Sequence, residues 1–200
     1  MKNSRVRSLT MAAIMGCVAF ILQFFSFNIP FLSPFASFDF SALPEIIGGF
    51  ILGPIGAIEI ILIKLGLILV FKGTTSMFTG ELQNLILSCA YVLPAILYYR
   101  KHRTKNGAIK GIVLGTILSV VLAVFTNMYL IFPAYIYLYG MNWNQILSMF
   151  SAINPAIGTK VGIVMFSVIP FNLISRITTS FLTFLLYKKI SKPIKHFIQE

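Results

Sequence analysis

Long apolar segments dominate the pattern of this chain, separated by short connections rich in glycine, proline or polar residues. Because a helix needs roughly 20 apolar residues to cross a bilayer, the pattern predicts six transmembrane helices in one domain, residues 1–200. Their expected ranges are 8–27, 41–52, 55–71, 80–99, 108–132 and 160–187. The sequence "GPIG" at 53–56 predicts a tight turn between the second and third helices. Pro133 is expected to end the fifth helix, and the connection 139–159 has room for an interfacial helix.

Composition agrees with the apolar pattern. Hydrophobic residues make up 58% of the 200 residues, charged residues make up 10%, and the mean hydropathy is +0.89. A soluble domain carries about 25% charged residues, so the sequence predicts an all-α integral membrane protein. No small-x-small cleavage motif follows the first apolar segment, which is therefore expected to be a retained helix and not a signal peptide.

The net charge of +11 is concentrated in three basic clusters between the apolar segments. The clusters are Lys2, Arg5 and Arg7; "RKHRTK" at 100–105; and Lys188, Lys189, Lys192 and Lys195. By the positive-inside rule, both termini and the loop 100–106 are expected in the cytoplasm of a plasma-membrane protein. The predicted outer loops 28–40, 72–79 and 139–159 contain only Lys72 as a basic residue. A nucleic-acid partner is not expected, because aromatic or polar readers do not accompany the charges.

Polar side chains inside the predicted helices mark the candidate binding site, since such groups are costly at this depth. They are Glu81, Asn84, Asn127 and Asn172, from three consecutive helices. A rise of about 1.5 Å per residue places them in the outer half of the bilayer, near the level of Phe38 and Asp39 in the first outer loop. A single asparagine in a membrane helix serves as often to contact a neighbouring helix as to bind a ligand. Four polar side chains at one depth, however, predict an outward-opening pocket. Amides both donate and accept hydrogen bonds, which favours a neutral ligand with imide or hydroxyl groups.

Three further charged side chains leave alternatives open. Glu59 and Lys64 are five positions apart and do not face each other well on one helix. Arg176 either extends toward the cytoplasm or pairs with Glu59 or with polar groups near Lys64, and in either case a structural or partner-facing role is favoured over contact with the ligand.

Small residues recur four positions apart in the first predicted helix, "TMAAIMGCVAF" at 10–20. The pairs are Ala12 with Gly16, and Ala13 with Cys17. Such spacing permits close approach of a second helix. That helix belongs either to a partner protein or to this chain.

Catalytic and metal-binding patterns are missing from the sequence. His102 and His196 stand in basic segments without a paired acid, and the two cysteines lie in apolar segments away from any metal-binding spacing. We therefore expect no catalytic residues, no metal and no cofactor. An intramembrane enzyme using Glu81 or Asp39, or a channel, is the alternative from a different functional class.

Several stretches resemble the substrate-binding (S) components of energy-coupling factor (ECF) vitamin transporters, most closely the riboflavin-specific ones. They are "PFLSPFASFDFSALPEIIGGFILGPIGA" at 30–57, the helix carrying Lys64, "TGELQN" at 79–84, "NMYLIFPAY" at 127–135 and "IPFNLISR" at 169–176. The resemblance covers residues 5–195 in order. None of these stretches alone is specific for the family. The combination of "DFS", "GPIG" and "IPFN" in one chain is specific for it.

This resemblance implies six spans and an outer flavin pocket beneath the first loop, with riboflavin as the transported ligand. It also implies partners, namely a transmembrane coupling protein docked on the small residues of the first helix and two ATPase subunits. The family's flavin contacts carry over to Asn84, Asn127 and Asn172. Relatives often have a lysine three positions after the asparagine of "IPFN", where this chain has Ser175 followed by Arg176, and both are included as candidate ligand contacts. An S component for a different vitamin is the alternative within the family.

Overall fold

The computed structural model describes residues 2–74 and 76–199, with side chains described except at 2–4, 188 and 190–199. Lys2, Lys188, Lys192 and Lys195 of the predicted basic clusters lie outside the described side chains. The helical segments are α1 (Lys2–Phe24), α2 (Ala42–Phe71), α3 (Thr79–Lys101), α4 (Lys105–Thr126), η1 (Asn127–Ile131, a π-helix), α5 (Phe132–Tyr139), α6 (Trp143–Ile153), α7 (Lys160–Ile163), η2 (Val164–Val168, a π-helix) and α8 (Ile169–Gln199). Two short antiparallel strands, β1 (Phe27–Asn28) and β2 (Ser37–Phe38), pair within the loop between α1 and α2.

The helices confirm an all-α, multi-pass membrane protein. Among the described residues, five helical stretches are long and apolar enough to cross a bilayer. They are Arg5–Phe24, Ala42–Phe71, Thr79–Lys101, Lys105–Tyr139 and Lys160–Tyr187. Large apolar side chains on these helices, such as Ile55, Val70, Phe125 and Phe181, are more than half exposed on the protein surface. A bilayer supplies the apolar surroundings that such side chains require.

A sharp break divides α2 into two arms at the predicted turn. Gly53 has a φ of +89° and is followed by Pro54. A left-handed backbone favours glycine, and the proline cannot continue the first arm. A methyl group added at Gly48 would lie 2.3 Å from Ile60 Cδ1, although these residues would be roughly 18 Å apart in a straight helix. The arms therefore fold back on each other.

The first arm, residues 42–52, is short. At about 1.5 Å per residue it rises roughly 16 Å, which is about half of the hydrocarbon thickness. The division into two helices near residue 53 is as predicted, and the count of six membrane spans stays a prediction.

The helix begun at Lys105 continues past Pro133 to Tyr139, so the prediction that Pro133 ends it is wrong. A π-helical turn, η1, stands immediately before the proline, and Pro133 occupies the first turn of α5. Inside a continuous helix a proline removes one backbone N–H from the hydrogen-bond ladder, and a local π-helical adjustment such as η1 accommodates that loss. The connection that follows contains α6, whose Asn142 and Gln145 form a reciprocal N-terminal capping box.

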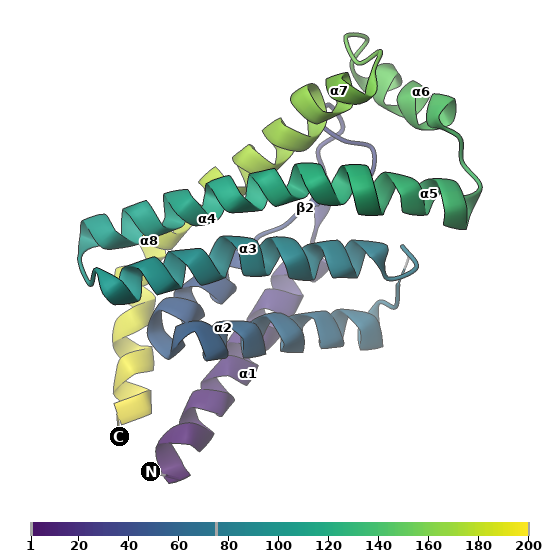
Figure 1. The fold of residues 1–200 in the computed structure, drawn as a ribbon. Coiled ribbons are helices and arrows are strands. Elements are labelled where there is room, and N and C mark those ends of the chain that lie inside the picture. The colour runs from purple at the N-terminus through teal and green to yellow at the C-terminus, as the bar shows by residue number, and fades with distance from the viewer. Residues whose placement is uncertain (1, 75, 200) are drawn as a thin grey trace.

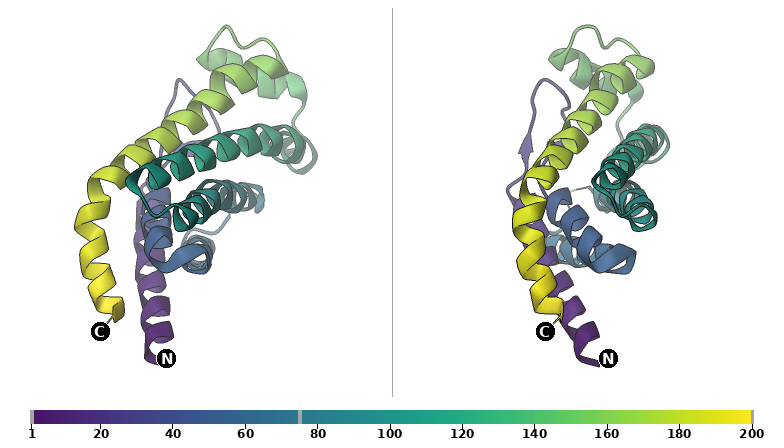
Figure 2. Two further views of the ribbon diagram at one scale, coloured as in Figure 1. Left: turned by 60° about the vertical axis from the view of Figure 1, so that its left-hand side comes forward. Right: turned by 90° about the vertical axis from the view of Figure 1, so that its left-hand side faces the viewer.

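Figure 1 shows α3, α4 and the second arm of α2 side by side, with α1 and α8 crossing them. α3 and α4 approach closely at two glycines, since a methyl added at Gly111 or Gly115 would lie 2.6 or 2.0 Å from a carbonyl oxygen of α3. The α3–α4 turn and the break in α2 lie at the left end in Figure 1, and the α2–α3 and α5–α6 connections lie at the right end. The two termini lie near each other in every view of Figure 2.

Candidate functional site

A cavity of about 360 Å³ opens among the first loop, the second arm of α2, α3, η1, α5, α6, η2 and α8. Small-molecule sites typically measure about 300–1,000 Å³. The cavity is flanked by both π-helical segments: Asn127 and Ile131 of η1 line it, and so do Ser167 and Val168 of η2. π-Helical turns occur often at functional sites. The cavity is therefore the candidate ligand site.

The structure brings most of the predicted ligand contacts to this cavity. Those lining it are Asp39, Glu81, Asn84, Asn127, Asn172, Ser175 and Arg176. Phe38 does not line it: its buried ring packs against Phe27 and Phe40, with centroids 5.3 and 5.2 Å away. Ser37 and Asp39 do line the cavity, because successive side chains of an extended segment point to opposite sides.

The cavity asparagines are oriented by their neighbours. The Nδ2 group of Asn127 donates to Ala123 O at 2.7 Å, and that of Asn172 donates to Val168 O at 2.9 Å. Each asparagine thus satisfies a carbonyl one helical turn earlier and leaves its Oδ1 free within the described part of the chain. The amide of Asn84 has the opposite orientation, because its oxygen, Oδ1, is the atom that faces a protein partner and accepts from Lys64 Nζ at 2.7 Å.

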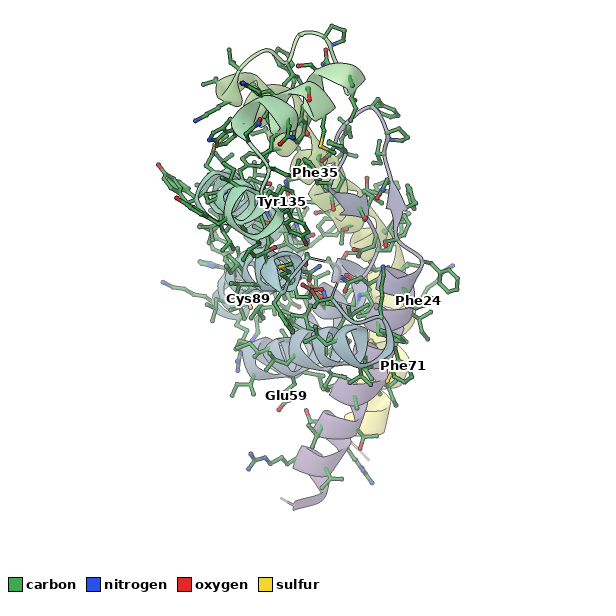
Figure 3. The ribbon with its side chains drawn as sticks, turned by 90° about the vertical axis from the view of Figure 1, so that its right-hand side faces the viewer. Phe24, Phe35, Glu59, Phe71, Cys89 and Tyr135 are labelled. Carbon is green, nitrogen blue, oxygen red and sulfur yellow. The ribbon has the colours of Figure 1, made fainter. Side chains whose placement is uncertain are left out.

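Lys64 forms a fully buried ion pair with Glu45, with Nζ 2.5 Å from Oε1 and both side chains 0% exposed. Its ammonium also donates to Ser41 Oγ at 3.4 Å. The folded-back α2 explains the pairing, since Glu45 lies on the first arm and Lys64 on the second. The prediction that Lys64 does not pair with Glu59 is consistent with this arrangement. Figure 3 shows Glu59 at the edge of the molecule, away from Phe35 and Tyr135.

Arg176 is held inside the protein. Its side chain is 8% exposed, Nε donates to Ser119 Oγ at 3.1 Å, and Cζ lies 4.9 Å from the ring centroid of Tyr91. The side chain neither extends toward the cytoplasm nor hydrogen-bonds to Glu59, whereas the hypothesis of a structural role agrees with these contacts. A buried guanidinium is stabilised by hydrogen bonds and aromatic faces, and α3 and α4 supply both.

The two predicted acidic contacts organise the loops at the cavity. Asp39 Oδ1 accepts from the backbone N–H of Ser41 at 2.7 Å, at the start of α2. Glu81 Oε2 accepts from Thr74 Oγ1 at 3.1 Å and from Ser76 Oγ at 2.7 Å, which ties the α2–α3 loop to α3. Among the described residues, no three His, Cys, Asp or Glu side chains come together as a metal site.

An aromatic wall closes one side of the cavity. Phe35 of the first loop packs against Tyr135 of α5 and Phe150 of α6, with ring centroids 4.7 and 5.6 Å apart. Phe35 and Tyr135 lie next to each other in Figure 3. The loop is also attached to η2, because Ser167 Oγ donates to Leu32 O. Aromatic faces of this kind suit a planar, apolar ligand ring.

Several residues at the cavity were missed by sequence reasoning, namely Gln23, Phe35, Tyr135, Phe150 and Ser167. Phenylalanine and serine in apolar segments are too common to single out. Sequence reasoning also assigned no role to Glu45, an acidic residue of the second predicted helix. If the chain folds back at Gly53, residues at similar distances before and after the turn lie side by side. Glu45 and Lys64 are at such positions, and this spacing is the signal that identifies them as partners.

The small residues of α1 divide between two faces. Ala12 is 0% exposed in a core cluster with Ile60, and a methyl added at Gly16 would lie 2.6 Å from Ile63 Cγ2. Including Ala12 and Gly16 in a partner-docking surface was therefore wrong, because they pack against α2. Ala13 is half-buried and Cys17 is exposed, and this second pair stays available to a partner.

Comparisons with known proteins agree in family. The family model described as "ECF transporter, substrate-specific component" matches residues 7–187. The chain is 29% identical over 194 residues to the riboflavin transporter RibU of Staphylococcus aureus (strain TCH60), covering 97% of this chain and 94% of that protein. It is 28% identical over 190 residues to the riboflavin transporter FmnP of Bacillus subtilis (strain 168), covering 94% of each.

A solved structure is also similar over almost the whole fold. It is described as "Structure and mechanism of the S component of a bacterial ECF transporter". The two chains superpose with a TM-score of 0.73 at 27% identity, over 96% of this chain and 99% of the other.

Proposed function

Because the chain belongs to the family of ECF transporter substrate-specific components, we propose that it captures riboflavin for an ATP-driven uptake transporter. The observation that carries this proposal is that predicted ligand contacts from the first loop, α3, η1 and α8 line one cavity. The relatives named riboflavin transporters support the choice of ligand, since they align over nearly the whole chain.

The cavity chemistry supports a flavin. A flavin has a flat aromatic ring system, a polar edge with carbonyl and imide groups, and a hydroxylated side chain. The aromatic wall of Phe35, Tyr135 and Phe150 offers contact to the ring. Asn84, Asn127 and Asn172 offer hydrogen bonds to polar groups of the ligand, and Ser175 and Arg176 add further polar contacts.

Transport requires partners in this proposal. The chain supplies the binding site, and a transmembrane coupling protein with two ATPase subunits supplies the energy. The coupling protein docks on the face of α1 that carries Ala13 and Cys17. Both arms of α2 count as spans, which gives six spans with both termini and the loop 100–106 in the cytoplasm and the cavity toward the outside.

Equilibrium titration of the detergent-purified protein with riboflavin tests the ligand directly, through quenching of flavin fluorescence. Saturable quenching with one site per chain is expected. Thiamine and biotin are the matched controls and should not displace the flavin. Displacement by another vitamin, with no specific quenching of riboflavin, would instead identify an S component of different specificity.

A further inference from the structure

The cavity asparagines do not offer a ligand the same hydrogen-bonding group. Asn84 Oδ1 accepts from the ammonium of Lys64 at 2.7 Å and from Ser88 Oγ at 3.4 Å. An ammonium group donates only, so the carbonyl end of this amide must face Lys64. The Nδ2 donors of Asn84 are then the atoms left for the cavity.

Asn127 and Asn172 are oriented in the opposite sense. Their Nδ2 groups donate to Ala123 O and Val168 O. A backbone carbonyl accepts only, so the amide nitrogen must face it. The Oδ1 acceptors of both residues are left for the cavity, which they line.

Lys64 is itself held in one position. Its ammonium donates to Asn84 Oδ1 at 2.7 Å and to Ser41 Oγ at 3.4 Å, and Nζ lies 2.5 Å from Glu45 Oε1 as an ion pair. Lys64 and Glu45 are both fully buried, so bulk water does not compete for these contacts. The ion pair therefore reaches the ligand site through Asn84, its closer hydrogen-bond partner, and through Ser41, both of which line the cavity.

We propose that the Glu45–Lys64 ion pair positions Asn84 for ligand recognition and so sets the donor and acceptor pattern of the cavity. The ligand group bound at Asn84 is a hydrogen-bond acceptor, and the groups bound at Asn127 and Asn172 are donors. This inference rests on the proposed function for its ligand. Riboflavin supplies both kinds of group, since its carbonyl oxygens accept while its imide N–H and hydroxyl groups donate.

The variant Asn84→Asp tests the pattern with almost no change of shape. A carboxylate still accepts from Lys64, but it presents an oxygen to the cavity where Asn84 presents N–H. We expect riboflavin affinity to fall at least about tenfold, as for a lost hydrogen bond to a buried polar group. The apparent melting temperature of the ligand-free protein should be unchanged or higher, because Lys64 gains a second anionic partner. Affinity equal to that of the wild type would overturn the proposal.

A second comparison separates positioning from a merely structural ion pair. Lys64→Met alone leaves Glu45 buried without its partner and should lower the melting temperature strongly. The double variant Glu45→Gln/Lys64→Met removes both charges and should recover most of that loss. Its riboflavin affinity should nevertheless stay about tenfold below the wild-type value, because Asn84 Oδ1 has lost its ammonium donor. Recovery of wild-type affinity together with stability would show that the pair serves folding alone, and the positioning role would be wrong.

Titrations of the wild-type protein distinguish failure of this inference from failure of the proposed function. A wild-type protein that does not bind riboflavin overturns both. A wild-type protein that binds, with an Asn84→Asp variant that binds equally well, overturns only the positioning role of Glu45 and Lys64.

Discussion

The guanidinium of Arg176 lies over the ring of Tyr91, with Cζ 4.9 Å from the ring centroid. The tyrosine hydroxyl is 2.9 Å from Ser180 Oγ, one turn further along α8. Together with the bond from Arg176 Nε to Ser119, these contacts join α8 to α3 and α4. An arginine in an apolar helix is thus explained by its partners on the neighbouring helices.

Two substitutions at Tyr91 separate the contributions of its ring and its hydroxyl group. Tyr91→Phe keeps the ring beneath Arg176 and loses the contact with Ser180, at a cost of about 1 kcal/mol. Tyr91→Leu also removes the ring face, which stabilises a desolvated cation by about 2 kcal/mol. We expect the leucine variant to have the lower melting temperature in detergent. Equal melting temperatures would contradict a cation–π contribution.

Asn172 and Arg176 should affect different properties. Asn172→Ala removes the Oδ1 acceptor that faces the cavity, so riboflavin affinity should fall at least tenfold, which corresponds to about 1.4 kcal/mol or more. Arg176→Gln should reduce riboflavin affinity less than Asn172→Ala does, and it should lower the melting temperature more. The reason is that Arg176 contacts Ser119 and Tyr91, which are side chains of neighbouring helices. Fluorescence titration and thermal unfolding of both variants check the order. An unchanged affinity for Asn172→Ala would remove this residue from the site.

Adjacent alanines on α1 should behave in opposite ways. Ala13→Trp places a large side chain on the half-buried face and should abolish cellular riboflavin uptake while leaving the affinity of the purified subunit nearly unchanged, since docking needs small residues. Ala12→Trp is the matched control, and it should destabilise the protein because Ala12 is fully buried beside α2. Normal uptake by the Ala13 variant would show that this face does not dock the coupling protein.

The topology predicts which loops are reachable from outside intact cells. In a protein lacking Cys17 and Cys89, a cysteine replacing exposed Asn106 at the start of α4 should not react with an impermeant maleimide, because the positive-inside rule predicts that this basic segment is cytoplasmic. A cysteine replacing exposed Asn144 near the start of α6 should react. Strong labelling at position 106 from outside would contradict the proposed orientation.

The sequence was sufficient to predict the asparagines that line the cavity, because the cost of an amide in a bilayer makes them conspicuous. Asn84, Asn127 and Asn172 are unusual at their depths, and helical rise alone places them at one level. The hydrogen-bonding direction of each amide was not predictable. It depends on Lys64, Ala123 and the π-helical turns, and a π-helical turn has no simple sequence signature.

Helix facing was harder to predict than helix position. Ala12 with Gly16 and Ala13 with Cys17 have identical spacing on faces about 100° apart, so spacing alone could not tell which pair packs against α2. The partners of Arg176 were hidden for a similar reason. Tyr91 and Ser119 lie on other helices, and their contact depends on the tertiary arrangement and not on a local pattern.

The most direct test of the central claim is a visible absorbance spectrum of the protein purified in detergent from cells grown with riboflavin. We predict a yellow protein whose flavin absorbance corresponds to about one flavin per chain. The Asn172→Ala variant, purified in the same way, should lose most of that absorbance. A colourless, folded wild-type protein that also fails to quench added riboflavin would contradict the claim that this chain is a riboflavin-capturing subunit.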